Sequence, residues 1–368
     1  MNLIQTIFHT HADEFMKQHS VDRHTAKVIR AIQRCRTGDC GYHQYACPTC
    51  GAGHVAASSC GNRHCPTCQN KRAADWVYHQ QLRLLPCAYF MVTFTLPEEV
   101  RDVARRFPRT VYDALLSQAA DALRTLEADE RFVGCAHPGF FGILHTWGRQ
   151  MQYHPHAHFI VAGGGLSENS ATWKSCRGNF LVHIRPLSIL FRNRMRDALA
   201  RAGLSAQIPP EVWNKTDWVV HCRHVGQGDR ALKYLGAYVS RVAISNARIL
   251  HYDGPTVTLK YQKVGSSKWR RLTLDVMEFI RRYLMHVLPK GFVKVRHYGF
   301  LHPNFRVKIE QLREIICAVH QTIRNFIVRP SPPKATKPLR CSRCQSRMKW
   351  IKYVPPLFVH AAAPPVPG

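Results

Sequence analysis

Three histidines at alternate positions of a short apolar segment are the clearest chemical signal in this sequence. The segment reads YHPHAHFIV over residues 153–161, with His154, His156 and His158 spaced by two. Alternate residues of a β-strand share a face, so a strand here places the three imidazoles side by side. Packing alone does not explain the pattern, because each buried imidazole would need its own hydrogen-bond partner. We therefore predict that His156 and His158 hold a metal ion.

A third ligand is expected from the strand that precedes this segment. If the chain turns near Gln150 and Met151, His145 falls opposite His156 across a hairpin and lies on the same face. His145 is thus the preferred third ligand, ahead of His154. A residue of the tyrosine-bearing helix described next could take that place instead, and a register slip of one residue would remove His145 from the site.

Tyr234 and Tyr238 lie four residues apart in KYLGAYVSR, a segment with a helical pattern. Residues at i and i+4 share one face of a helix. Alone, such a pair is more typical of an amphipathic core helix, but beside a histidine metal site it favours catalysis. A tyrosine oxygen can attack a DNA phosphorus in line, leaving a phosphotyrosine and a free 3′-hydroxyl, if the charge on the phosphate is neutralised. The flanking Lys233 and Arg241 could assist as fixed cations.

Cysteines form a second constellation near the N-terminus. Seven of the 14 cysteines lie between Cys35 and Cys68, and the chain has no recognisable export signal, which favours metal binding over disulfides. Two CPTC motifs, separated by fourteen residues, have the spacing of a four-cysteine zinc site. The expected structural zinc ligands are Cys47, Cys50, Cys65 and Cys68.

The same stretch contains more potential ligands than one ion can use, so a second zinc ion is expected. The preferred set for this ion is Cys35, His43, Cys60 and His64, with Cys40 as a substitute. For Cys40 and His54 a role as buried thiol or surface imidazole is favoured over ligation. Zinc would supply much of the folding free energy of so small a module.

Three basic side chains near the cysteine motifs are candidate DNA contacts. Arg63, Lys71 and Arg72 would flank a loop held by metal and could neutralise backbone phosphates. The alternative is a solvated basic face, which is the commoner fate of any single charge.

Composition indicates a polyanionic partner. The 368 residues include 52 Lys and Arg against 23 Asp and Glu, a formal charge of +29, and the arginines run through the whole chain. No apolar run approaches the roughly 20 residues that span a bilayer, and the N-terminal segment does not resemble a signal peptide. We expect nucleic acid as the partner, no membrane contact and a cytoplasmic location.

The elements that must position these residues alternate between helix and strand. Buried strands are predicted at AYFMVTFTLP, in a hairpin over FGILHTWGRQMQYHPHAHFIVAGGGL, and in a second hairpin from TVTLKYQKV to WRRLTLDV. Helices are predicted over 20–34, 71–85, 109–127, 186–201 and 229–245 and at MEFIRRYLMHVL. The fold class is therefore α+β with an antiparallel sheet.

Three regions are expected along the chain. Residues 1–85 would form the zinc-binding DNA-recognition domain, and residues 86–327 the catalytic domain. Residues 328–368 would form a basic, proline-rich linker and a tail with one further C-x-x-C pair, Cys341 and Cys344, ending in a disordered segment. No second cysteine pair follows, so whether this tail binds metal stays open.

These segments together resemble the two-tyrosine HUH transposases of rolling-circle insertion sequences, the IS91 family. The matching pieces are SCGNRHCPTCQ, FMVTFTLP, HTWGRQMQYHPHAHFIVAGGGL, KYLGAYVSRVAISNARI and RHYGFL, in the family's order over nearly the whole chain. The resemblance matches His156 and His158 to the HUH pair, Tyr234 and Tyr238 to the two nucleophiles, and the N-terminal cysteines to the family's zinc domain.

The resemblance also implies partners and cofactors. It implies an HUH-type antiparallel sheet with flanking helices, a catalytic Mg²⁺ or Mn²⁺ beside the structural Zn²⁺, and a bacterial enzyme associated with the nucleoid. Such an enzyme cuts and rejoins single-stranded DNA at hairpin-bearing insertion-sequence ends and at target DNA. Whether one or both tyrosines are essential stays open, as does the oligomeric state.

Two other interpretations remain. A plasmid replication initiator or relaxase uses the same strand-cleavage chemistry, although the long zinc module and RHYGFL favour a transposase. A zinc-dependent DNA-binding regulator would use the histidine strand only for a structural ion.

Overall fold

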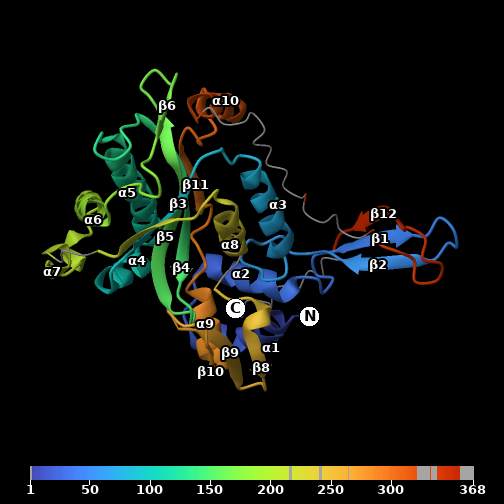
Figure 1. The fold of residues 1–368 in the computed structure, drawn as a ribbon. Coiled ribbons are helices and arrows are strands. Elements are labelled where there is room, and N and C mark those ends of the chain that lie inside the picture. The colour runs from blue at the N-terminus through green and yellow to red at the C-terminus, as the bar shows by residue number, and fades with distance from the viewer. Residues whose placement is uncertain are drawn as a thin grey trace, which may run out of the picture.

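A six-stranded antiparallel sheet lies at the centre of the computed structural model, which describes residues 2–214, 218–239, 243–263, 265–320, 332 and 338–356. The strands follow the order β11-β4-β5-β3-β7, and β6 pairs with the C-terminal end of β5 (Figure 1). These strands are β3 (Tyr89–Thr95), β4 (His137–Trp147), β5 (Tyr153–Leu166), β6 (Trp173–Ser175), β7 (Val220–His224) and β11 (Val295–Gly299). The expected α+β class with an antiparallel sheet is confirmed.

The β4–β5 hairpin has the predicted register. His145 pairs with His156, and Ile143 pairs with His158. The chain reverses between Trp147 and Tyr153, with Met151 in the left-handed backbone region at φ 62°. Since directly paired residues of antiparallel strands share a face, His145, His156 and His158 lie on the same side of the sheet.

Helices cover both faces of the sheet, which explains why its central strands are apolar on both sides. On one face Phe94, Phe159 and Phe191 pack edge to face in the largest apolar cluster. The helices of this face are α4 (Arg101–Arg106), α5 (Pro108–Ala128) and α6 (Ile184–Arg201). On the opposite face, which carries the three histidines, lie α3 (Gln69–Gln81), α8 (Asp229–Val239) and α10 (Ile309–His320) (Figure 1).

A second core joins the N-terminal helices to a later part of the chain. Phe8 and Ile29 share one apolar cluster with Val257, Phe279 and Tyr283. The elements concerned are α1 (Leu3–Gln18), α2 (Arg23–Arg34), α9 (Val276–Leu284) and the sheet β10-β9-β8, formed by β8 (Ile249–Tyr252), β9 (Thr256–Gln262) and β10 (Trp269–Asp275). The packing therefore crosses the boundary that we placed after residue 85.

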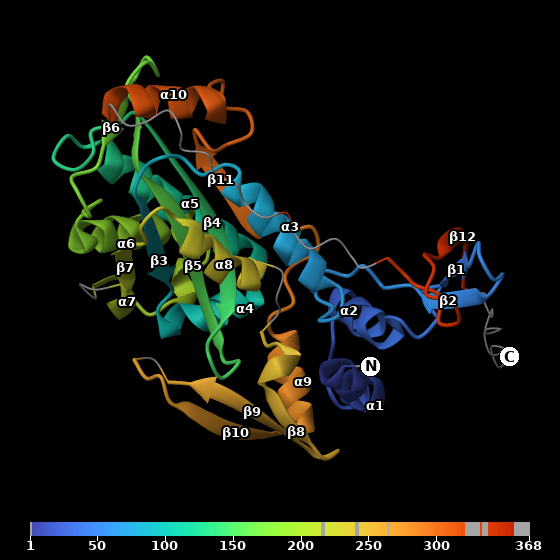
Figure 2. The same ribbon diagram turned by 45° about the vertical axis from the view of Figure 1, so that its right-hand side comes forward.

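A small sheet, which we call the ribbon, projects from the body (Figures 1 and 2). Its strands are β1 (Tyr42–Ala46), β2 (Gly53–Ala57) and β12 (Lys349–Val354), in the order β12-β1-β2. The C-terminal residues were expected to form a separate tail, but β12 instead pairs with β1 along its whole length. The ribbon thus combines the two ends of the chain.

The remaining elements are short. They are α7 (Glu211–Asn214) and the 3₁₀ turns η1 (Glu98–Val100), η2 (Ser205–Gln207) and η3 (Asn246–Arg248). The helix predicted over 229–245 is shorter than expected, because α8 is described over Asp229–Val239 and residues 243–245 are not helical. None of the described helices is long and apolar enough to cross a bilayer.

Candidate active site

Three histidines converge on the sheet face that α3 and α8 cover. The ring centroids of His145 and His158 are 4.7 Å apart, those of His156 and His158 are 4.9 Å apart, and those of His145 and His156 are 5.3 Å apart. One ring nitrogen from each of the three lies within 4.8 Å of those of the other two. The arrangement has the donor chemistry and spacing of a three-imidazole metal site.

Hydrogen bonds at Nδ1 orient two of these rings. The Nδ1 of His156 donates to the backbone carbonyl of His154 at 2.7 Å, and the Nδ1 of His158 shares a hydrogen bond with the Thr93 hydroxyl at 2.8 Å. Such contacts fix the ring and leave Nε2 for an ion. Burial lowers the pKa of His158 to about 4 and holds the pKa values of His145 and His156 well below the usual range. The rings are therefore neutral at pH 7, as metal ligation requires.

His154 does not belong to this group. Its Nδ1 accepts a hydrogen bond from the guanidinium of Arg101 at 3.2 Å. Burial, followed by the Arg101 charge, lowers the pKa of His154. The structure therefore places His145 among the three converging rings, whereas His154 serves the site through its backbone carbonyl.

The tyrosine helix α8 packs on the same sheet face. Leu232 and Leu235 are fully buried, in one apolar cluster with Ile143 and Ile160. On the opposite side of the helix the side chain of Tyr234 is 50% exposed. The buried leucines explain the position of the helix, and they leave Tyr234 open to solvent beside the sheet.

The direction of α8 follows from the chain on either side of it. Gly228, just before the helix, lies against the ring of Tyr89, whereas Arg248, after the helix, donates to the carbonyl of Arg149 in the β4–β5 turn. The helix therefore advances along β3 towards Thr93, the partner of His158. Position 238 lies one turn further in that direction. The side chain of Tyr238 and the whole of Arg241 lie outside the described residues.

The hollow beside Tyr234 contains residues that the sequence analysis did not identify. It has a volume of about 650 Å³ and is lined by Arg223 and Arg230 as well as Tyr234. In the edge strand β7, Arg223 pairs with Met91, and His221 pairs with Thr93, so both lie on the histidine face. In the sequence, the only indication of this was that His221 and Arg223 alternate in HCRH, as residues on one face of a strand do. Arg223 therefore adds positive charge to this face, and His221 places a further imidazole on it, outside the group of three.

Lys233 has a local partner. Its ammonium forms an ion pair with Asp229 at 2.6 Å, one turn earlier in α8, and both side chains are largely exposed. Exposed pairs of this kind contribute little to stability. Lys233 is thus partly neutralised, and the nearby Arg223 is the stronger candidate for a phosphate contact.

The cysteines form two groups of four. In the first, the sulfur of Cys68 lies 3.5 Å from that of Cys35 and 3.6 Å from that of Cys60, and Cys65 completes the set. In the second, Cys47 lies 3.4 Å from Cys344, and Cys50 lies 3.5 Å from Cys341. Tetrahedral zinc with bonds of about 2.3 Å separates its sulfurs by about 3.8 Å, so both groups fit zinc.

This grouping corrects our expected zinc sites. The pairs Cys47–Cys50 and Cys65–Cys68 do not share one site, because β2 lies between them. Its five residues carry the chain back roughly 17 Å from the tip of the β1–β2 hairpin, where the first pair lies. Each pair is completed by other cysteines, and the C-terminal pair closes the site at the tip.

The expected histidine ligands of the second zinc site lie elsewhere. His43 accepts a hydrogen bond from the indole of Trp350 at 3.3 Å on the ribbon. His64 is buried, and its Nε2 accepts from the backbone N–H of Leu288 at 3.1 Å. Cys40 bonds weakly to the carbonyl of Arg34 and is in neither group. All eight grouped ligands are therefore cysteines.

Arg63 also differs from expectation. Its guanidinium donates to the carbonyls of Phe292 at 2.6 Å and Pro289 at 3.1 Å, which anchors the cysteine loop to the chain after α9. It is a structural brace here rather than a free phosphate contact. The side chains of Lys71 and Arg72 lie outside the described residues.

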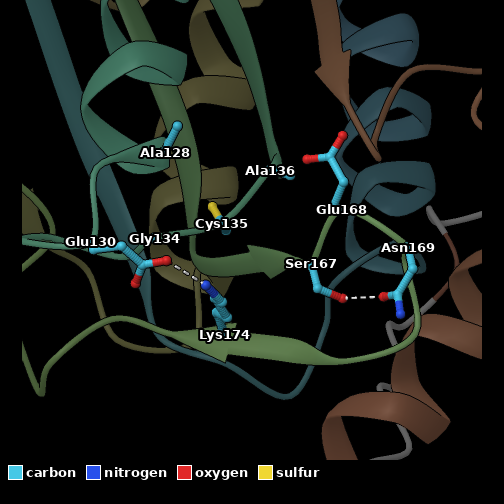
Figure 3. Close-up of a pocket in the computed structure, with 9 residues that line it drawn as sticks. All are labelled: Ala128, Glu130, Gly134, Cys135, Ala136, Ser167, Glu168, Asn169 and Lys174. Atoms are coloured by element: carbon cyan, nitrogen blue, oxygen red, sulfur yellow. Dashed lines mark hydrogen bonds and ion pairs between the residues drawn. The ribbon is translucent and has the colours of Figure 1, made fainter.

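Another hollow of about 650 Å³ lies at the far end of β5 (Figure 3). It is lined by Glu130 and Glu168, and Lys174 forms an ion pair with Glu130 at 2.7 Å. Eleven residues of extended chain separate Ser167 in this hollow from His156, roughly 35 Å. This hollow therefore belongs to a different part of the molecule from the histidine site.

Comparisons with known proteins identify both halves of the chain. A family described as "Transposase zinc-binding domain" matches residues 7–96, and a family described as "Putative transposase" matches residues 139–308. The second match contains the histidine hairpin and the tyrosine helix. No solved structure was found to match.

Two relatives match over most of their length. A protein of Sinorhizobium fredii named "Putative transposase y4qJ" is 36% identical over 85% of this chain and 84% of its own. The transposase for insertion sequence element IS801, from Pseudomonas savastanoi pv. phaseolicola, is 29% identical over 90% of this chain and 85% of its own.

Proposed function

Because this chain belongs to the IS91 family of transposases, we propose that it cuts and rejoins single-stranded DNA at insertion-sequence ends through a 5′-phosphotyrosine intermediate, as rolling-circle transposition requires. The observation that carries the proposal is the placement of α8. The helix that bears both tyrosines packs on the sheet face where His145, His156 and His158 converge.

The proposed cleavage forms one bond and breaks another at the same phosphorus. The phenol oxygen of Tyr234 or Tyr238 attacks the phosphorus while its proton passes to solvent. The bond from phosphorus to the 3′-oxygen breaks, and that oxygen takes a proton to become a free 3′-hydroxyl. In rejoining, a 3′-hydroxyl attacks the phosphotyrosine and releases the tyrosine. Each step conserves one phosphodiester bond, so no external energy source is needed.

The histidine group fits a divalent cation. His145, His156 and His158 would hold Mg²⁺ or Mn²⁺, which supplies positive charge beside a phosphate oxygen when bound. Burial keeps the three rings neutral, and Thr93 and the carbonyl of His154 fix two of them. The chain's own residues thus prepare the site before DNA arrives.

Basic groups on the same face would hold the DNA backbone. Arg223 and Arg230 line the hollow next to Tyr234. A strand crossing this face would place successive phosphates near these cations while a scissile phosphate reaches the tyrosines. The proposed partners are single-stranded DNA, end hairpins and target DNA.

The two tyrosines would act in succession. One turn of helix separates them on one face, so each can hold a strand end while the other is free. Since α8 advances towards Thr93 and His158, the position of Tyr238 is the nearer to the histidines along β3, and we propose that Tyr238 makes the first cut.

A covalent adduct tests this proposal. The protein is incubated with Mn²⁺ and single-stranded oligonucleotides that carry the element's ends, labelled at either terminus. A 3′ label should remain on the protein in denaturing gels, whereas a 5′ label should be released. Tyr238→Phe should abolish the adduct, and Tyr234→Phe should permit cleavage but block completed strand transfer. His158→Ala should remove cleavage.

The control is Tyr261→Phe on β9, which should leave the adduct unchanged. Absence of an adduct with every end sequence, together with tight DNA binding, would favour the zinc-dependent regulator. A label retained from the 5′ side would overturn the polarity of the proposed linkage.

A further inference from the structure

One face of the ribbon gathers aromatic rings that are ligands neither of the cysteine groups nor of the histidine site. We define the aromatic face as His43 and Tyr45 on β1, His54 on β2, and Trp350 and Tyr353 on β12. The strand register places them together, because His43 pairs with Tyr353, and Tyr45 pairs with both Trp350 and His54. Directly paired residues share a face of an antiparallel sheet.

Contacts between the rings hold the face in shape. The indole of Trp350 donates to Nδ1 of His43 at 3.3 Å, and the rings of His43 and Tyr353 lie 5.5 Å apart. Nevertheless the rings remain accessible, since Trp350 is 56% exposed and Tyr353 is 45% exposed. Large aromatic side chains fixed in place and left in solvent indicate a binding surface.

The charge around this face selects the class of partner. Residues 338–356, which supply β12 and its cysteine pair, contain five basic residues and no acidic one, and residues 40–72 contain no acidic residue either. Lys349 and Lys352 pair with Ala46 and Gln44, so they lie on the opposite face of the ribbon, whereas the exposed Arg340, Arg343 and Arg347 lie before β12 around the C-terminal cysteine pair. An anionic partner with flat, apolar groups satisfies both the charges and the rings.

We propose that the aromatic face binds single-stranded DNA by stacking unpaired bases on Trp350 and Tyr353, with the exposed arginines around the C-terminal cysteine pair, Arg340, Arg343 and Arg347, neutralising phosphates. Stacking on protein rings requires bases that are free of their own stack, so a single strand suits this face and a duplex does not. The proposal extends DNA binding to a surface built by both ends of the chain. It rests on the DNA-binding part of the proposed function and not on the strand-transfer chemistry.

The face depends on the zinc site at the ribbon tip. Trp350 and Tyr353 reach His43 through the pairing of β12 with β1, and the same segment brings Cys341 and Cys344 to Cys47 and Cys50. Arg343 lies between Cys341 and Cys344, and Arg347 follows shortly after them, so zinc binding also positions two of the five basic residues.

Fluorescence anisotropy with a labelled 20-nucleotide oligothymidylate and a 20-base-pair duplex tests the proposal on the full-length, zinc-loaded protein. Trp350→Ala should weaken oligothymidylate binding about tenfold, the energy of one stacked base. Trp350→Phe should retain most of the affinity. The matched control is Tyr42→Ala, an exposed aromatic residue on the opposite face of the ribbon, which should bind as the wild type does.

Photocrosslinking provides a second measurement that needs no variant. Oligonucleotides containing 5-iodouracil should crosslink to Trp350 or Tyr353, as mapped by mass spectrometry. Wild-type affinity in Trp350→Ala with crosslinks only elsewhere would overturn the proposal, as would an equal loss of duplex binding. Covalent adduct formation on a short oligonucleotide should persist in Trp350→Ala, which separates failure of this face from failure of the strand-transfer mechanism.

Discussion

The hydroxyl of Thr93 on β3 lies 2.8 Å from Nδ1 of His158 on the neighbouring strand β5. This hydrogen bond orients a ring of the proposed metal site without touching the ion. Thr93→Val keeps the shape of the side chain and removes the hydrogen bond. We expect the Mn²⁺ concentration for half-maximal cleavage to rise about 10- to 100-fold, with the maximal rate recovered at saturating Mn²⁺.

Cleavage rates measured across a Mn²⁺ titration check this prediction. Thr258→Val serves as the control, because Thr258 bonds to Thr273 in the β9–β10 hairpin. An unchanged Mn²⁺ midpoint in Thr93→Val would show that the hydrogen bond does not support metal binding.

The two cysteine groups should each bind one zinc ion, so the zinc content of variants should distinguish them. Each group has four sulfurs, so the wild-type chain is expected to carry two zinc ions. Cys341→Ser should reduce this to one ion, because it opens the ribbon site and leaves Cys35, Cys60, Cys65 and Cys68 intact. Elemental analysis of purified protein measures the ratio.

The matched control is Cys317→Ser on α10, outside both groups, which should keep two ions. If Cys341→Ser also kept two ions, the zinc ion bound by Cys47 and Cys50 would need its other ligands from a different part of the chain. Loss of both ions would mean that the two sites are not independent.

Arg223 should contribute to DNA binding through its charge. It lines the hollow beside Tyr234 and projects from the histidine face of β7. Arg223→Ala should weaken binding of single-stranded DNA and reduce the slope of log affinity against log salt by about 0.7, the value for one phosphate contact on a single strand. Arg196→Ala on α6, where Arg196 pairs with Asp197, should leave the slope unchanged. Equal slopes of log affinity against log salt for Arg223→Ala and the wild type would show that Arg223 does not contact a DNA phosphate.

His286 should make folding stability depend on pH. It is buried, its Nε2 donates to the carbonyl of Met151 at 3.0 Å, and its Nδ1 accepts from Thr146 at 3.2 Å. Burial lowers the pKa of His286 to about 4, whereas an unfolded histidine titrates near 6.5. As pH falls from about 6.5 to 4, the imidazole of residue 286 binds a proton in the unfolded chain but not in the native chain, so the contribution of His286 to stability decreases by about 3 kcal/mol and then levels off.

Urea unfolding at several pH values measures this effect. His286→Gln should be less stable at pH 7 but should lose less stability on acidification than the wild type. The exposed His9→Gln control should follow the wild-type curve. Parallel pH profiles for His286→Gln and the wild type would contradict the prediction.

Local patterns predicted the central elements well. The alternation of histidines indicated β5, the turn near Gln150 placed His145 opposite His156, and the apolar run before Pro97 indicated β3. These features depend on periodicity and on pairing between segments close in the sequence, and both can be recognised from the local residue pattern. The helix α8 was also expected, although its C-terminal end was placed too late.

Long-range pairing could not be predicted in the same way. The motif spacing of the cysteines suggested one site, but β2 separates the two motifs, and Cys341 returns from the other end of the chain. The residues around one cysteine pair do not indicate which distant cysteines complete its metal site. The contribution of His221 and Arg223 was missed for a similar reason, because β7 is short and only its pairing with β3 reveals its face.

The pairing of β12 with β1 sets the order in which this protein is completed during synthesis. Cys47 and Cys344 meet in one site although 297 positions separate them. The chain must therefore leave the ribosome as far as Val354 before the ribbon can close, and β1 and β2 lack their third strand until then. Copies that terminate before Cys341 retain the histidine hairpin and the tyrosines yet lack the closed ribbon and, with it, the proposed aromatic face.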